Sequence, residues 1–201
     1  MQNQRFKLCV MCIFSLLFCW SCTRVINTKI EKIGNLPTPL IEPLPLTAGV
    51  YYGKDFCNYK LSHAHEPISS VTIIYNAQLG KANVSLFDYI LSNSFKKVIP
   101  IKHLPEGHED FENIDVIIEP TVNDFSPWLP NYLSYEMKFY LPDGKVINWL
   151  IKGTSKKTRV LLTSNAVKKE TQVEMRNIAA QFMTGFCKQK EIQKHFYKQC
   201  N

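Results

Sequence analysis

The segment Tyr135–Ile151, YEMKFYLPDGKVINWLI, decides the fold of this 201-residue chain. Apolar side chains alternate with more polar ones on both sides of a central Pro-Asp-Gly, which is typical of two antiparallel strands joined by a tight turn. Gly144 suits a turn position that needs a positive φ, and the ring of Pro142 restricts the backbone where the turn begins. The sequence therefore predicts a β-hairpin with one face on a hydrophobic core.

A first amphipathic helix is expected before the hairpin. Residues 83–98 carry apolar side chains at intervals of three and four, which places them on one helical face. Ser85 with Asp88 resembles an N-terminal capping pair, and Lys96 and Lys97 suit the negative end of a helix dipole.

A second helix is expected near the C-terminus. It should open at Thr171-Gln172-Val173-Glu174, which has the residue types and spacing of a capping box. Its buried face is expected to hold Met175, Ile178 and Phe182, again at helical spacing.

Short extended segments complete the domain. Strands are expected at residues 50–56, 70–75, 98–101 and 114–122, where β-branched and aromatic residues are frequent. Pro120 cannot donate a backbone hydrogen bond, which indicates a sheet edge or a bulge near the end of its strand. The order of elements predicts an α+β fold: a single domain with an antiparallel or mixed sheet and two helices packed on one face.

The N-terminus has the pattern of an export signal. Residues 1–7 include Arg5 and Lys7 and no acidic residue, and residues 8–20 form an apolar run with one serine. A bilayer-spanning helix needs about 20 residues, whereas a basic start followed by about 7–15 apolar residues is typical of a secretory signal peptide.

Ser21 and Cys22 follow this run and resemble the lipobox of bacterial lipoproteins. The resemblance covers only this N-terminal segment. It implies removal of residues 1–21, acylation of Cys22 with palmitate-type chains, and stable attachment to a membrane. Thr23, being a residue other than Asp, implies sorting to the outer membrane with the domain facing the periplasm.

Residues 22–46 are expected to be a Pro-rich tether, and residues 47–201 the folded periplasmic domain. Alternating prolines in the tether favour an extended polyproline path. The alternative is that its second half packs along the domain as irregular coil.

Charge and cysteine content narrow the class of protein. The formal net charge is +7, and it becomes +5 without residues 1–21, with scattered basic residues and no basic stripe typical of a nucleic-acid surface. Of the seven cysteines, Cys57, Cys187 and Cys200 remain after the signal peptide and the lipidated Cys22 are set aside. One disulfide and one free thiol can form among these three, and the spacing leaves the pairing open.

Several polar clusters are candidates for catalytic or metal sites. His63, His65 and Glu66 would need a third imidazole from His103 or His108, and structural zinc usually has four ligands with tighter pair spacing. The acidic residues between Glu106 and Asp115 lack the alternating oxygens around a Gly turn of a calcium loop. No nucleophile or phosphate-loop motif is present. The expectation is solvated loops, no cofactor, no metal and no enzymatic activity.

The segment 125–132, FSPWLPNY, is the candidate contact site. Phe125, Trp128 and Tyr132 lie in a loop stiffened by two prolines, and aromatic residues of this kind anchor protein interfaces or membrane surfaces. The alternative is that Trp128 folds back and caps the core.

The favoured function is a non-catalytic, lipid-anchored accessory protein of a cell-envelope assembly, export or secretion complex. The order of elements together with the anchor resembles small envelope-assembly lipoproteins, such as the lipopolysaccharide-assembly lipoprotein and relatives of the curli-secretion and polysaccharide-export lipoproteins. A second hypothesis is a lipoprotein that binds a small or lipidic ligand between helices and sheet. A third is a periplasmic enzyme that uses Cys57 or the histidines.

Overall fold

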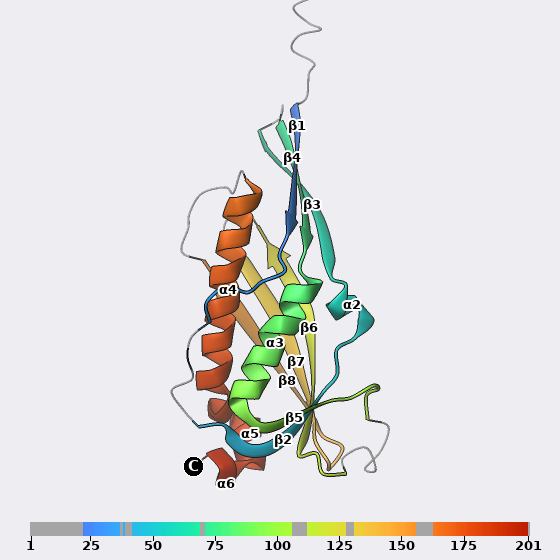
Figure 1. The fold of residues 1–201 in the computed structure, drawn as a ribbon, viewed down its shortest axis with the longest axis vertical. Coiled ribbons are helices and arrows are strands. Elements are labelled where there is room, and N and C mark those ends of the chain that lie inside the picture. Colours follow the sequence, from blue (N-terminus) through green and yellow to red (C-terminus); the bar gives the residue numbers. More distant parts are fainter. Residues whose placement is uncertain are drawn as a thin grey trace, which may run out of the picture.

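Two sheets form the framework of the fold (Figure 1). The computed structural model describes residues 22–36, 38, 42–68, 71–105, 112–127, 131–155 and 163–200. The larger sheet has the strand order β5 (Phe95–Pro100), β2 (Leu44–Val50), β6 (Val116–Ser126), β7 (Tyr132–Tyr140) and β8 (Val146–Thr154). The smaller sheet has the order β1 (Cys22–Lys29), β4 (Val71–Gln78) and β3 (Lys60–Ile68).

Both sheets are mixed. Strand β2 runs parallel to β5 and β6, while β6, β7 and β8 follow one another in antiparallel order. In the smaller sheet β1 is parallel to β4, and β3 is antiparallel to it. The predicted α+β class with a mixed sheet is confirmed.

The predicted hairpin forms as strands β7 and β8. Gly144 has a φ of +81°, so the turn uses the left-handed conformation that glycine adopts without strain. Tyr135, Met137 and Phe139 are buried, and they pair across the ladder with Ile151, Trp149 and Ile147. The alternation in the sequence thus buries one face of the hairpin in the core.

Two helices cover the same face of the larger sheet, as predicted (Figure 1). Helix α3 (Gly80–Ser94) places Phe87 edge-on against Tyr135, with ring centroids 5.0 Å apart. Helix α4 (Ser164–Gly185) places Phe182 against Phe139, with centroids 6.5 Å apart. Because Tyr135 and Phe139 lie four residues apart on one strand, they point to the same side of the sheet.

The boundaries of α3 differ from the prediction. The helix starts three residues earlier and ends four residues earlier, so Lys96 and Lys97 lie in β5. The chain becomes extended at Phe95 because the following residues pair with β2. The predicted capping pair is wrong, since the N-cap residue is Leu79 and the Asp88 carboxylate accepts a hydrogen bond from the Tyr52 hydroxyl at 2.8 Å.

The predicted start of the C-terminal helix is also wrong. Helix α4 begins at Ser164, where the Thr163 hydroxyl accepts a hydrogen bond from the Ala166 N–H at 3.2 Å. Thr171 lies inside the helix and its hydroxyl donates to the Val167 carbonyl. The expected buried face does form: Met175, Ile178 and Phe182 are fully buried.

The prediction of a tether at residues 22–46 is contradicted by strand β1. Residues 22–29 pair with β4 from Cys22 opposite Val71 to Lys29 opposite Gln78. Ile26 and Ile30 are buried in the hydrophobic core. Asn27 and Lys29 between them are exposed on the solvent side of this edge strand, while Thr28 is buried. Composition alone does not distinguish such a strand from a linker.

The segment after β1 also packs on the domain. The Gln172 side-chain amide donates to the Lys32 carbonyl, and the Arg176 guanidinium donates to the Asn35 carbonyl. Strand β2 begins at Leu44, so the domain boundary predicted at residue 47 falls inside a strand.

Two further elements differ from the sequence prediction. An extended segment was expected at residues 50–56. Instead, strand β2 ends at Val50, and a short helix, α2 (Lys54–Cys57), follows it. Strand β3 was not predicted, because Pro67 and two histidines weaken its strand pattern. The expectation for Pro120 is confirmed: a register shift interrupts β6 between Val122 and Asp124.

The packing of β1 can be tested with two neighbouring residues. Ile26→Ala should lower the free energy of unfolding by about 2–5 kcal/mol, because it opens a cavity in the core. Val25→Ala is the matched control, since Val25 is 51% exposed and Ile26 only 4%. Its effect should stay within about 0.5 kcal/mol in urea denaturation. Equal, small effects of both substitutions would mean that residues 22–29 do not pack in the core and would support the predicted tether.

Candidate functional site

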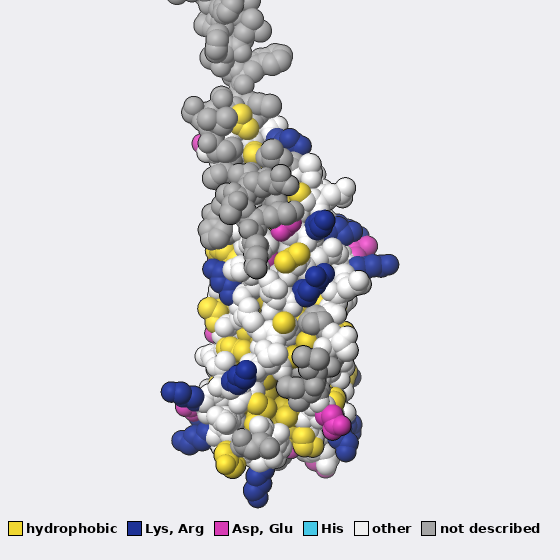
Figure 2. Space-filling model, turned by 90° about the vertical axis from the view of Figure 1, so that its left-hand side faces the viewer, with side chains coloured by type: hydrophobic (Ala, Val, Ile, Leu, Met, Phe, Trp, Pro, Cys, Tyr) yellow, Lys and Arg dark blue, Asp and Glu magenta, His cyan; other side chains and the backbone are white. Residues whose placement is uncertain are grey.

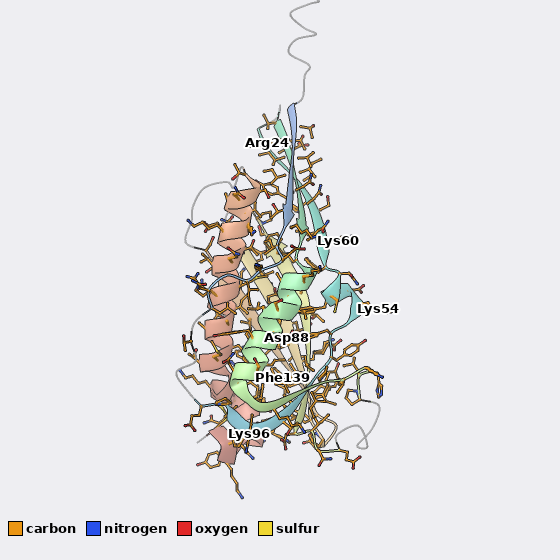
Figure 3. The ribbon with its side chains drawn as sticks, viewed as in Figure 1. Arg24, Lys54, Lys60, Asp88, Lys96 and Phe139 are labelled. Atoms are coloured by element: carbon orange, nitrogen blue, oxygen red, sulfur yellow. A yellow bond between two sulfur atoms is a disulfide. The ribbon has the colours of Figure 1, made fainter. Side chains whose placement is uncertain are left out.

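Cys22, the predicted lipid attachment site, is the first residue of β1 and lies at one end of the molecule. Arg24 is near the same end (Figure 3). Thr23, Arg24 and Val25 are exposed. Residues 1–21 and the Cys22 side chain lie outside the described part of the chain, so the signal peptide and the lipid remain predictions.

The aromatic segment at residues 125–132 divides into a buried part and a surface part. Phe125 is 4% exposed and belongs to the hydrophobic core, so a role for it in partner contact is wrong. The bulge in β6 just before it changes the alternation and turns its side chain inward. Trp128 lies outside the described residues.

Tyr132 is half-buried at the start of β7, on the face of the sheet that the helices do not cover. Its hydroxyl donates a hydrogen bond to the Asp124 carboxylate, which raises the pKa of Tyr132. The Lys152 ammonium lies 3.6 Å from the centroid of the Tyr132 ring, a cation–π geometry. Tyr132 is thus held in one orientation by two neighbouring strands.

The cysteine pairing left open by the sequence is resolved. Cys187 and Cys200 form a disulfide with a Cα–Cα distance of 5.3 Å, and Cys57 is a free thiol. The bridge joins η2 (Phe186–Lys188) to α6 (Tyr197–Cys200), with α5 (Lys190–His195) between them. Burial and the Asp88 carboxylate raise the pKa of the Cys57 thiol, which disfavours the reactive thiolate.

The histidines and the acidic segment do not gather into a site within the described residues. His63 is exposed on β3, opposite Tyr75 of β4, and His103 is exposed after β5. The Asp115 carboxylate accepts the backbone N–H of Thr47 at 2.7 Å. The described part of the chain contains no group of three His, Cys, Asp or Glu side chains suited to a metal ion. Glu106, Glu109, Asp110, His108 and the His65 side chain fall outside it.

A buried carboxyl group that the sequence analysis missed lies on α4. Glu174 is 1% exposed, and its Oε2 has no hydrogen-bond partner among the described residues. Thr171, Glu174, Met175 and Ile178 follow the helical spacing of one face, so the signal was present. Because Glu174 was interpreted as part of a capping box, it was not included in the predicted buried face.

Burial raises the pKa of Glu174 from the ordinary value of 4.5 to about 9, with Glu170 adding repulsion and a hydrogen bond from Ser155 opposing it. Glu174 is therefore protonated at neutral pH. Nearby, the Tyr135 hydroxyl donates to Asn83 Oδ1 at 2.7 Å, and Asn83 Nδ2 has no partner among the described residues.

This buried acid makes the stability of the protein pH-dependent. Because the folded state keeps a proton that the unfolded chain loses above pH 4.5, stability should fall as the pH rises toward 9. Glu174→Gln mimics the protonated acid, and it should gain on the order of 3 kcal/mol over the wild type between pH 5 and pH 7. Urea unfolding at pH 5, 7 and 8 measures this difference.

Glu136→Gln, the same substitution at a half-buried position on the helix-free face of β7, is the matched control. A difference between Glu174→Gln and the wild type that stays constant with pH would mean that Glu174 is charged in the folded protein.

A cavity of about 780 Å³ lies at the end of the molecule opposite Cys22. It is bounded by residues 42–45 at the start of β2, the end of α3, the end of α4 and the disulfide-linked segments η2 and α6. This volume is in the range of small-molecule sites in proteins, about 300–1,000 Å³.

No helix among the described residues is long and apolar enough to span a membrane. No protein-family model and no curated protein matches the chain. Among solved structures, protein XCC0632 from Xanthomonas campestris, of the DUF330 family, is similar with a TM-score of 0.47 and 12% identity, covering 85% of this chain and 99% of that protein.

A dodecameric PelC variant from Paraburkholderia phytofirmans has a TM-score of 0.34 and 10% identity, covering 72% of this chain and 95% of that one. With both TM-scores below 0.5, neither likeness supports a statement about the function of this chain.

Proposed function

We propose that this protein is a non-catalytic accessory component of a cell-envelope assembly, export or secretion complex, held at the outer membrane by a lipid on Cys22 and facing the periplasm. The signal-like residues 1–21 and the lipobox-like Ser21-Cys22 support export and acylation. Thr23 supports the outer membrane as the destination.

The observation that carries the proposal is the place of Cys22 in the fold. Strand β1 begins at this residue and is paired with β4 along its whole length, so no flexible spacer separates the acylation site from the domain. Helix α4, whose N-terminal part packs beside β1, has 22 residues and is about 33 Å long. An anchor at Cys22 would therefore hold one end of the molecule at the membrane and direct the other end into the periplasm.

A surface for a protein partner is available on the face of the larger sheet that the helices leave open. Strand β8 forms one edge of this sheet. Its apolar side chains Val146 and Leu150 are 46% and 59% exposed. Tyr132 and Lys152 lie on the same face. Exposed apolar and aromatic side chains at an unpaired sheet edge are suited to contact with another protein.

Acylation can be tested by metabolic labelling with palmitate. Cys22→Ser should abolish the label and leave the signal peptide uncleaved, whereas Cys57→Ser, which removes a cysteine that is not an acylation site, should keep it. Persistence of the label in Cys22→Ser would refute the anchor.

Localisation is tested with Thr23→Asp, which should move the labelled protein from the outer to the inner membrane in a sucrose gradient. Leu150→Lys should then lose a stoichiometric partner in mild-detergent co-purification without a lower melting temperature. Absence of any stoichiometric partner for the wild type would argue against the accessory role.

A further inference from the structure

The cavity at the end distant from Cys22 has an apolar floor. Phe186 is buried there and packs edge-on against Phe95, with ring centroids 5.2 Å apart. Leu44, Met183 and the Cys187–Cys200 disulfide continue this lining. In Figure 2, which faces the α4 side, hydrophobic side chains are gathered toward the same lower end of the molecule. A lining of this kind is suited to an aliphatic chain, and the thioether of Met183 adapts readily to its shape.

Polar groups are arranged around this floor. The ionisable residues that line the cavity, among those described, are Glu42 and Lys188, and both are exposed. Asn93, Gln193 and Gln199 add side-chain amides. The lining therefore combines an apolar interior with a polar rim, which matches a molecule that is apolar along its length and polar at one end.

Ser94, the last residue of α3, also lines the cavity, but its Oγ is buried from solvent and therefore lies out of reach of a molecule in the cavity. The polar groups available to a bound molecule are those of the rim.

We propose that this cavity binds a single-chain amphiphile, such as a fatty acid or a monoacyl lipid. The alkyl chain lies over Leu44, Met183 and Phe186, and the polar head lies at the rim, near Asn93, Lys188 and Gln193. The acyl chains expected on Cys22 cannot be the ligand, because β1 begins at the other end of the molecule and α4 alone separates the two ends by about 33 Å. This proposal does not depend on the lipid anchor.

The test is photo-cross-linking in cells that make the full-length protein and are fed a palmitic acid analogue carrying a diazirine and a terminal alkyne. Tryptic fragment 177–188 contains Met183 and Phe186, whereas fragment 146–152 contains the exposed Val146 and Leu150 as an internal surface control. The label should appear on 177–188 well above its level on 146–152. It should persist on 177–188 in Cys22→Ser, where the anchor is lost.

Two substitutions connect the label to the cavity. Met183→Trp should fill the cavity and reduce labelling of 177–188 to the level of 146–152, while Leu150→Trp should leave it unchanged. Ala180→Trp, which fills the cavity from a second position on α4, should reduce the labelling in the same way.

The proposal is overturned if 177–188 is not labelled above 146–152, or if Met183→Trp is labelled like the wild type. If Met183→Trp is unstable, Ala180→Trp decides, and labelling of that variant like the wild type would overturn the proposal.

Discussion

Helix α4 can approach strand β8 as closely as it does because residue 153 has no side chain. A Cβ on Gly153 would lie 2.1 Å from the Glu174 carbonyl oxygen and 2.9 Å from the Ile178 side chain. Close contact at this point sets the position of α4 along the sheet. It buries Phe182 against Phe139 and Trp149, brings the N-terminal part of the helix beside β1, and directs its C-terminal end toward the disulfide and the cavity.

The same contact explains why Glu174 is buried. Glu174 lies on the face of α4 that meets β8, and water is excluded from this face by the close approach of the helix. A carboxyl group in such a place keeps its proton because the charged form would be poorly solvated. The protein tolerates this residue at neutral pH by holding it neutral, with the Ser155 hydroxyl as its hydrogen-bond partner.

The parts of the fold that were predicted from the sequence are those determined by local patterns. The hairpin at Gly144 and the buried face of α4 follow from periodicity and turn chemistry, which need no knowledge of distant residues. Strand β1 could not be predicted, because its burial depends on parallel pairing with β4, some 50 residues later in the chain. At the candidate contact site, a bulge reversed the expected orientation of Phe125, and bulges have no dependable sequence signature.

Strand β1 also has a mechanical consequence if Cys22 carries a lipid. Tension between the membrane and a partner in the periplasm would enter the domain at the first residue of β1 and act along that strand. The β1–β4 ladder, from Cys22 opposite Val71 to Lys29 opposite Gln78, would then be loaded in shear, with its hydrogen bonds sharing the force. Ile26 and Ile30 add buried apolar surface that must also be exposed before the strand can slide. A domain attached in this way transmits force rigidly, whereas a flexible leash would absorb it.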